Sequence, residues 1–277
     1  LILGCWEAAT HLFGIPVFIL PPPSRIFTAA ILKAPLILPH AATTLAEILL
    51  GIMLALATAI PLAIAMFANP GLEKGLAPFL VASQAVPVFA IAPLLVVWMG
   101  YGIASKVFMA WVIIFFPITI SLLAGLKSCD PEFRILFKLM GASFYDTLML
   151  LYWPWALPQF FSGLRVGVTV ATIGAVIGEW VGAQQGLGYL MIQSNARLQV
   201  DLVFAAILWL TAMGLGLWML VPPLLGFYLL SQIEPLTGWF RQDLMMGAVW
   251  FALGYMVCCG LGILPTYAPS IVCGWIF

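Results

Sequence analysis

Long apolar runs separated by short polar stretches dominate this chain. A helix needs about 20 consecutive apolar residues to cross a membrane. By that criterion the sequence predicts six spans, over residues 43–68, 76–99, 104–126, 158–182, 202–230 and 244–264. The second is broken by Pro87 and Pro93. The apolar stretch 1–13 is too short to cross, and we expect a truncated span rather than a signal peptide, because no basic segment or cleavage site accompanies it.

The composition supports a membrane protein. Hydrophobic residues make up 64% of the chain and charged residues only 7%, against roughly 25% charged in a soluble domain. Because a spanning segment must satisfy its own backbone hydrogen bonds, the fold class predicted is an all-α integral membrane protein, a polytopic bundle of about six helices. The formal net charge is zero, which gives no basic face for nucleic acid. The five cysteines show no metal-ligand or disulfide spacing.

One polar loop, residues 127–157, interrupts this pattern between the third and fourth spans. Its sequence predicts a short helix over Glu132 to Met140, which Gly141 ends because glycine accepts the left-handed conformation of a helix stop. Ser143 then caps a second helix, with Asp146 completing a capping box. Two interpretations stay open: a slim elbow that docks a partner, or an amphipathic segment lying on lipid headgroups.

Polar residues inside spans are costly in hydrocarbon and are therefore candidates for function. Glu179, near the outer end of its span, is either a gate residue on the pathway or a carboxylate that reaches water. Ser83 and Gln84 precede Pro87, where they could line a cavity or form interhelical hydrogen bonds. We expect Arg165 to extend to the cytoplasmic interface and Glu47 to the outer one.

Several stretches, in this order, resemble the permease subunits of type I ABC importers, in the branch that carries nitrate, sulfonates, taurine and thiamine precursors. The resemblance covers about residues 6–235 and rests on Ile19-Leu20-Pro21-Pro22-Pro23-Ser24, Trp98-Met99-Gly100-Tyr101-Gly102, Gly141-Ala142-Ser143, Ala156-Leu157-Pro158, Gly178-Glu179-Trp180-Val181-Gly182 and Gly186-Leu187-Gly188-Tyr189. Each is weak alone, but the ordered set is specific. It implies a permease domain over residues 1–240, in which loop 127–157 contacts an ATPase.

The resemblance also implies the partners. The chain contains no G-x-x-x-x-G-K-[ST] loop, so ATP and magnesium would be bound by separate ATPase subunits, and no cofactor is expected in this chain. A separate solute-binding protein would deliver the substrate, and two permease copies in the lipid bilayer would form the path. The residues expected to couple the ATPase are Glu132, Lys138, Gly141, Ala142, Ser143, Asp146 and Pro154. The expected location is the inner membrane, as a multi-pass protein.

Two features depart from the family pattern. The Glu-Ala-Ala that names the family's coupling loop is Ile135-Leu136-Phe137 here, so an acidic contact is missing. Residues 241–277 extend beyond the usual end and contain a further apolar run without a family role. Orientation by charge is weak, with five cations on the loop side against four on the other.

The substrate expected from the run Ala175 to Gly182, with Asn195-Ala196-Arg197, is a hydroxymethylpyrimidine-type thiamine precursor. Sulfonate, taurine and nitrate are the alternatives within the family. A membrane enzyme is disfavoured because the only histidines, His11 and His40, form no H-E-x-x-H motif and no G-x-S-x-G is present. A channel would need a selectivity filter or a ring of charge, and neither is visible.

Overall fold

A computed structural model of the chain describes residues 2–232. Of these, residues 2–218 form one compact unit. The predicted span 244–264, the predicted domain boundary at residue 240 and the segment 241–277 lie outside the described residues.

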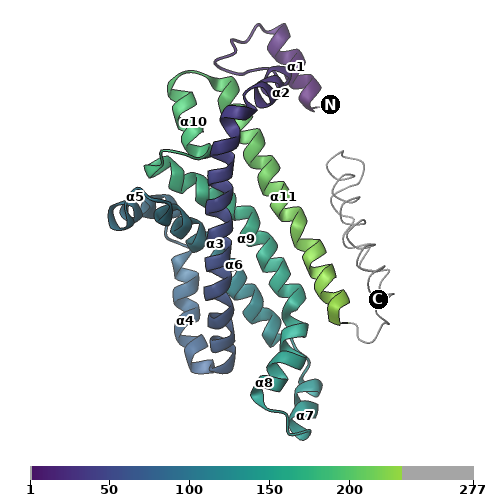
Figure 1. Cartoon of the computed structure of the whole chain (residues 1–277). Helices are drawn as coiled ribbons and strands as arrows, with labels where there is room; N and C mark the ends of the chain where they lie inside the picture. The colour runs from purple at the N-terminus through teal and green to yellow at the C-terminus, as the bar shows by residue number, and fades with distance from the viewer. Residues whose placement is uncertain (1, 233–277) are drawn as a thin grey trace. The chain divides into compact units, whose positions relative to one another are not determined.

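The described chain is helical throughout, without a strand, which confirms the predicted fold class (Figure 1). Its first half contains α1 (Ile2–Leu12), α2 (Pro23–Leu32), α3 (Ala34–Ala68), α4 (Pro70–Ser83), α5 (Val88–Met99) and α6 (Ile103–Lys127). Its second half contains α7 (Pro131–Leu139), α8 (Phe144–Thr147), a π-helical turn (Leu148–Tyr152), α9 (Trp153–Gly182), α10 (Leu187–Ala196) and α11 (Val200–Gln232).

Four stretches of the described chain are long and apolar enough to cross a membrane: α3, α6, the run Phe144–Gly182 and residues Val200–Val221 of α11. The predicted span over 76–99, broken by Pro87, is a bent pair of helices in the structure. Here α4 and α5 meet at 98°, so they make a fifth crossing only if the bent pair counts as one. Pro87 is the cap residue before α5, and proline disfavours a helical residue before it, which accounts for the break.

Helix α6 is the centre of the packing, with α9 and α3 against it (Figure 1). Small residues allow these close approaches. A Cβ on Gly163 of α9 would lie 2.4 Å from the Ser121 Cβ of α6, and one on Gly51 of α3 would lie 2.7 Å from the Ala110 Cβ. Without a hydrophobic effect between helices in lipid, such close backbone packing is a main source of association. It fixes both α9 and α3 against α6.

Candidate functional site

The polar loop forms the predicted elbow, two short helices joined by a turn at Gly141 (residues 131–147), as the sequence indicates. Helix α7 spans Pro131–Leu139, with the Asp130 side chain accepting the Glu132 N–H at 3.0 Å. Gly141 follows with φ +72°, the left-handed conformation expected of a helix stop. The Asp146 N–H donates to Ser143 Oγ at 3.1 Å and the Ser143 N–H donates to Asp146 Oδ2 at 3.3 Å. The predicted capping box is confirmed.

The elbow is anchored to the bundle at its base. Arg134 Nη2 donates to the Lys127 carbonyl at 2.7 Å, and its guanidinium lies 5.5 Å from the Tyr152 ring centroid. Lys127 Nζ forms an ion pair with Glu73 Oε1 at 2.6 Å, which joins the end of α6 to the start of α4. The π-helical turn then leads into α9, whose first turn contains Pro154. Movement of the elbow therefore has a direct mechanical route into α9.

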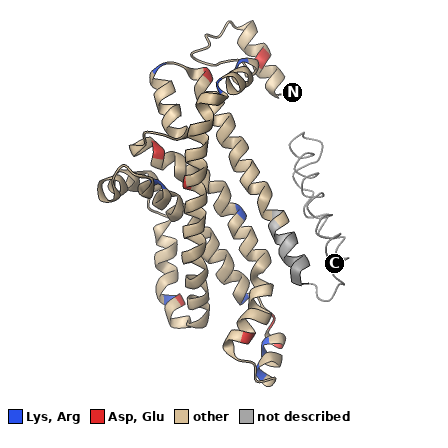
Figure 2. Ribbon diagram, viewed as in Figure 1, with Lys and Arg blue, Asp and Glu red and all other residues tan. Residues whose placement is uncertain are grey.

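The tip of the elbow exposes large apolar side chains among its charges. Leu139 is 80% exposed, Met140 73%, Phe144 54% and Tyr145 67%. Figure 2 shows basic and acidic residues on α7 and an acidic residue on α8. Glu132 and Lys138 are exposed on this surface, and Ala142 is partly exposed. An apolar tip with a charged rim is the composition of a protein docking surface.

A second polar cluster lies at the opposite end of α9. Glu179 is 1% exposed, so the interpretation that it simply reaches water is wrong. Thr44 Oγ1 on α3 donates to Glu179 Oε1 at 2.6 Å, and the Gly188 N–H on α10 donates to Oε2. The Leu187 N–H donates to Thr44 Oγ1 at 2.8 Å. Glu179 thus joins α3, α9 and α10, and we call this set the Glu179 junction.

Gly186 closes the Glu179 junction. Its φ is +118°, and a Cβ there would lie 2.3 Å from Glu179 Oε1, so only glycine fits. The Gly186 N–H donates to His40 Nδ1 at 3.1 Å, which requires the proton of a neutral His40 ring to be on Nε2. The turn between α9 and α10 is therefore shaped around the carboxylate.

Two further charged residues are buried beside Glu179. Glu47, which we expected to reach the outer interface, is 2% exposed. Its carboxyl group is within hydrogen-bonding range of that of Glu179, and its Oε2 has no partner among residues 2–232. Lys106 of α6 is 4% exposed and supplies a positive charge near both, while its Nζ donates to the Tyr101 and Gly102 carbonyls at 2.7 and 2.9 Å. In the sequence, these three charged residues could be noticed because each lies inside a predicted span.

Ser83 and Gln84 lie outside this buried cluster of charged residues. They are exposed at the corner between α4 and α5, where Ser83 Oγ donates to the Leu80 carbonyl at 2.7 Å. Neither forms an interhelical hydrogen bond within the described chain. The position predicted as the middle of a span is the corner of a bent pair.

The polar groups near α1 and α2 form a separate outer group. Glu7 of α1 accepts hydrogen bonds from the Ser24 hydroxyl at 2.6 Å and the Ser24 N–H at 3.0 Å. These bonds lower the pKa of the partly exposed Glu7 carboxyl below its ordinary value, because they favour the charged form. Lys33 Nζ pairs with Asp201 Oδ2 at 3.1 Å, joining the start of α3 to the start of α11.

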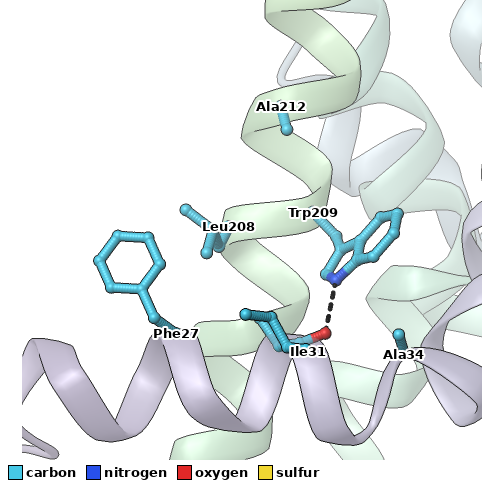
Figure 3. Close-up of a pocket in the computed structure, with 7 residues that line it drawn as sticks. Phe27, Ile31, Ala34, Leu208, Trp209 and Ala212 are labelled. Atoms are coloured by element: carbon cyan, nitrogen blue, oxygen red, sulfur yellow. Dashed lines mark hydrogen bonds between the residues drawn. The ribbon is translucent and has the colours of Figure 1, made fainter. Parts of the chain in front are cut away.

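A hollow of about 440 Å³ lies between α2 and α11 (Figure 3). Phe27 and Ile31 line one side, and Leu208 and Trp209 line the other. The Trp209 indole N–H donates to the Ala30 carbonyl at 3.2 Å, so it is already paired. The lining offers almost no polar group to a solute, and we do not place the transport site there.

Comparison with known proteins decides the family. The model of the "binding-protein-dependent transport system inner membrane component" family matches residues 47–235. The chain belongs to this family. It is therefore a multi-pass permease of the ABC importer type in the cell membrane, as the sequence pattern indicated.

The relatives agree on the class and differ in solute. A probable ABC transporter permease of Haemophilus influenzae is 43% identical over 83% of this chain and 94% of its own. The formylaminopyrimidine transport permease ThiX of Halalkalibacterium halodurans is 38% identical over 84% and 90%. The riboflavin transport permease RibX of Chloroflexus aurantiacus is 39% identical over 79% and 83%. The taurine permease TauC of Escherichia coli is less similar, at 32% over 73% and 76%.

Proposed function

We propose that this permease imports a hydroxymethylpyrimidine-type thiamine precursor, delivered by a solute-binding protein and driven by ATPase subunits docked on the α7–α8 elbow. Two copies of the chain would form the path. The observation that carries the coupling role is the capped, exposed elbow, whose apolar tip (Leu139, Met140, Phe144) is joined through the π-helical turn to α9.

The mechanism follows from that connection. ATP would close the two ATPase subunits, the elbows would move with them, and each α9 would tilt with its elbow, converting an inward-open path to an outward-open one. At the far end, the Glu179 junction ties α9 to α3 and α10. Because this junction spans three elements, motion of α9 would be transmitted to α10, and Glu179 is our candidate for the residue that holds the outer gate.

The substrate proposal is supported by the names of the relatives. The permeases named for nitrogen heterocycles, formylaminopyrimidine and riboflavin, are 38% and 39% identical to this chain, against 32% for the taurine permease. A pyrimidine is thus favoured over a sulfonate. Riboflavin is the second candidate, because its permease is as similar as that for the pyrimidine.

Reconstitution tests this proposal. The permease, its ATPase and its solute-binding protein would be placed in proteoliposomes, and ATP-driven uptake of labelled hydroxymethylpyrimidine, riboflavin and taurine would be compared. We expect uptake of the pyrimidine only, abolished when either partner is omitted. Uptake of riboflavin or taurine alone would overturn the substrate, and ATP-independent uptake would overturn the importer mechanism.

A further inference from the structure

One face of α9 carries polar side chains that packing with α3 and α6 does not cover. Its residues recur at helical spacing and are exposed or partly exposed: Ser162, Arg165, Thr169 and Thr172. The opposite face holds the small residues that pack on α6, such as Gly163 and Gly174. We call these four residues the α9 polar stripe.

Arg165 is the chemical centre of the stripe. It lies near the middle of α9, and its guanidinium is 5.4 Å from the ring centroid of Trp218 on α11. This contact differs from the extended conformation toward the cytoplasmic interface that we expected. Its Nε is buried without a hydrogen-bond partner, and within residues 2–232 no carboxylate comes within 4.0 Å of it. The structure therefore leaves most of its donors free.

Arg165 indicates which medium this side of α9 faces. Leu49, Leu50 and Met53 are exposed on α3 and are all apolar, as expected of a surface against lipid, and α9 also exposes the apolar Val166 and Ile173. A cation in the middle of a span is costly against lipid and instead faces a bundle interior or a water-filled cavity. The position of Arg165 therefore indicates that this side of α9 borders an aqueous path.

We propose that Arg165, Trp218 and the hydroxyl of Thr169 form a solute-contact site midway along the translocation path. The ligand class is a small flat heterocycle that carries hydrogen-bond acceptors. The indole offers a stacking face, and the guanidinium offers planar donors to ring nitrogens or an oxygen substituent. Thr169 Oγ1 donates to the Arg165 carbonyl at 2.9 Å, which leaves its oxygen free to accept from an exocyclic amino group. The ligand class rests on the pyrimidine function proposed above, whereas the aqueous wall does not.

Thiol labelling tests the wall without reference to any solute. Ser162→Cys and Thr169→Cys would be made in a chain whose five native cysteines are replaced by serine, and assembled with ATPase and receptor. The control is Met53→Cys on the apolar face of α3. We expect a charged methanethiosulfonate to label the stripe cysteines on the order of tenfold faster than the control, because the thiolate forms only in contact with water. Equal, slow labelling would show that lipid or the second copy covers the stripe, and would overturn the proposal.

Solute contact is tested by Arg165→Gln and Trp218→Ala, with Lys74→Gln, an exposed cation on α4, as the control. At saturating loaded receptor we expect pyrimidine uptake to fall roughly tenfold in the first two variants, since hydrogen bonds to a charged donor contribute that order of affinity. Capture of the ATPase should stay at the wild-type level, because neither residue lies on the elbow. Normal uptake by Arg165→Gln would overturn the site. If the wild-type complex itself moves no pyrimidine, the proposed substrate fails while the labelling result still stands.

Discussion

The two ends of α9 use polar residues in opposite ways. At the elbow, Ser143 and Asp146 satisfy each other across three residues of sequence and remain exposed. At the far end, Thr44 reaches Glu179 across 135 residues of sequence, and both are buried. At the elbow, the polar groups find their hydrogen-bond partners within the same turn and stay exposed. At the junction, the partners come from distant parts of the same chain.

This difference separates two tasks. A carboxylate without water needs its own hydrogen-bond donors, and the Glu179 junction supplies them from α3 and α10, so it holds the fold together. The elbow has few buried contacts, so its apolar tip is available to a partner. We therefore expect changes at the junction to affect the isolated permease and changes at the elbow to affect the complex.

The largest effect is expected from Gly186→Ala. A Cβ there meets the Glu179 carboxyl group, and φ +118° is strained for any L-residue. The free energy of unfolding should fall by about 3 kcal/mol or more, because strain and lost charged hydrogen bonds add. Thermal melting of the detergent-solubilised permease measures it, with Gly216→Ala, where a Cβ meets nothing within 4 Å, as the control. Equal melting of the two variants would contradict the junction's geometry.

Glu179→Gln should have a smaller effect. The amide keeps the shape: its oxygen can accept the Gly188 N–H, and its NH₂ group can donate to Thr44 Oγ1, whose hydroxyl then donates to the His40 carbonyl 3.1 Å away. Replacing a charged acceptor by a neutral one costs about 1 kcal/mol. If the charge also holds the gate, ATP hydrolysis should become high without the receptor while the complex still assembles. A variant silent in both melting and basal hydrolysis would remove Glu179 from the account and favour Gln84.

Gly141→Val tests the elbow, the other end of the comparison. A β-branched residue at φ +72° costs about 1–2 kcal/mol, and it distorts the turn. Because a Cβ at Gly141 meets nothing within 4 Å, the isolated permease should lose no more than this strain in its free energy of unfolding, but capture of the ATPase should be lost. Gly75→Val in α4, also free of neighbours, is the control. Normal capture and transport by Gly141→Val would refute the coupling role of the elbow.

The smallest effect is expected from Ser143→Ala. Removing the cap leaves the Asp146 N–H without its acceptor, which costs about 1 kcal/mol in the stability of α8. Receptor-stimulated ATP hydrolysis should fall several-fold, with the melting temperature of the permease unchanged. Thr147→Ala, which removes a hydroxyl bonded only to the Ser143 carbonyl, is the matched control. An equal loss in both variants would show that the cap has no particular role.

The same comparison explains what the sequence predicted. The elbow depends on residues within a few positions of each other, so Gly141, Ser143 and Asp146 were sufficient to predict its helices and its cap. The Glu179 junction depends on Thr44 and Gly188, brought together only by packing of α3, α9 and α10. Its polar residues could be identified as unusual, but not as partners. Likewise, Pro87 marked a break, but the 98° bend depends on packing that no local pattern encodes.

Hydrogen exchange of backbone amides compares both ends of α9 in one experiment, and so tests whether the Glu179 junction is closed while the elbow is open. In the isolated permease, the amides of Gly186 to Gly188, which donate to His40, Thr44 and Glu179, should exchange slowly. The elbow segment 139–147 should exchange quickly, and adding the ATPase should slow it without changing the junction. An elbow already protected in the isolated permease and unaffected by the ATPase, or a junction that exchanges as fast as the elbow, would contradict the account.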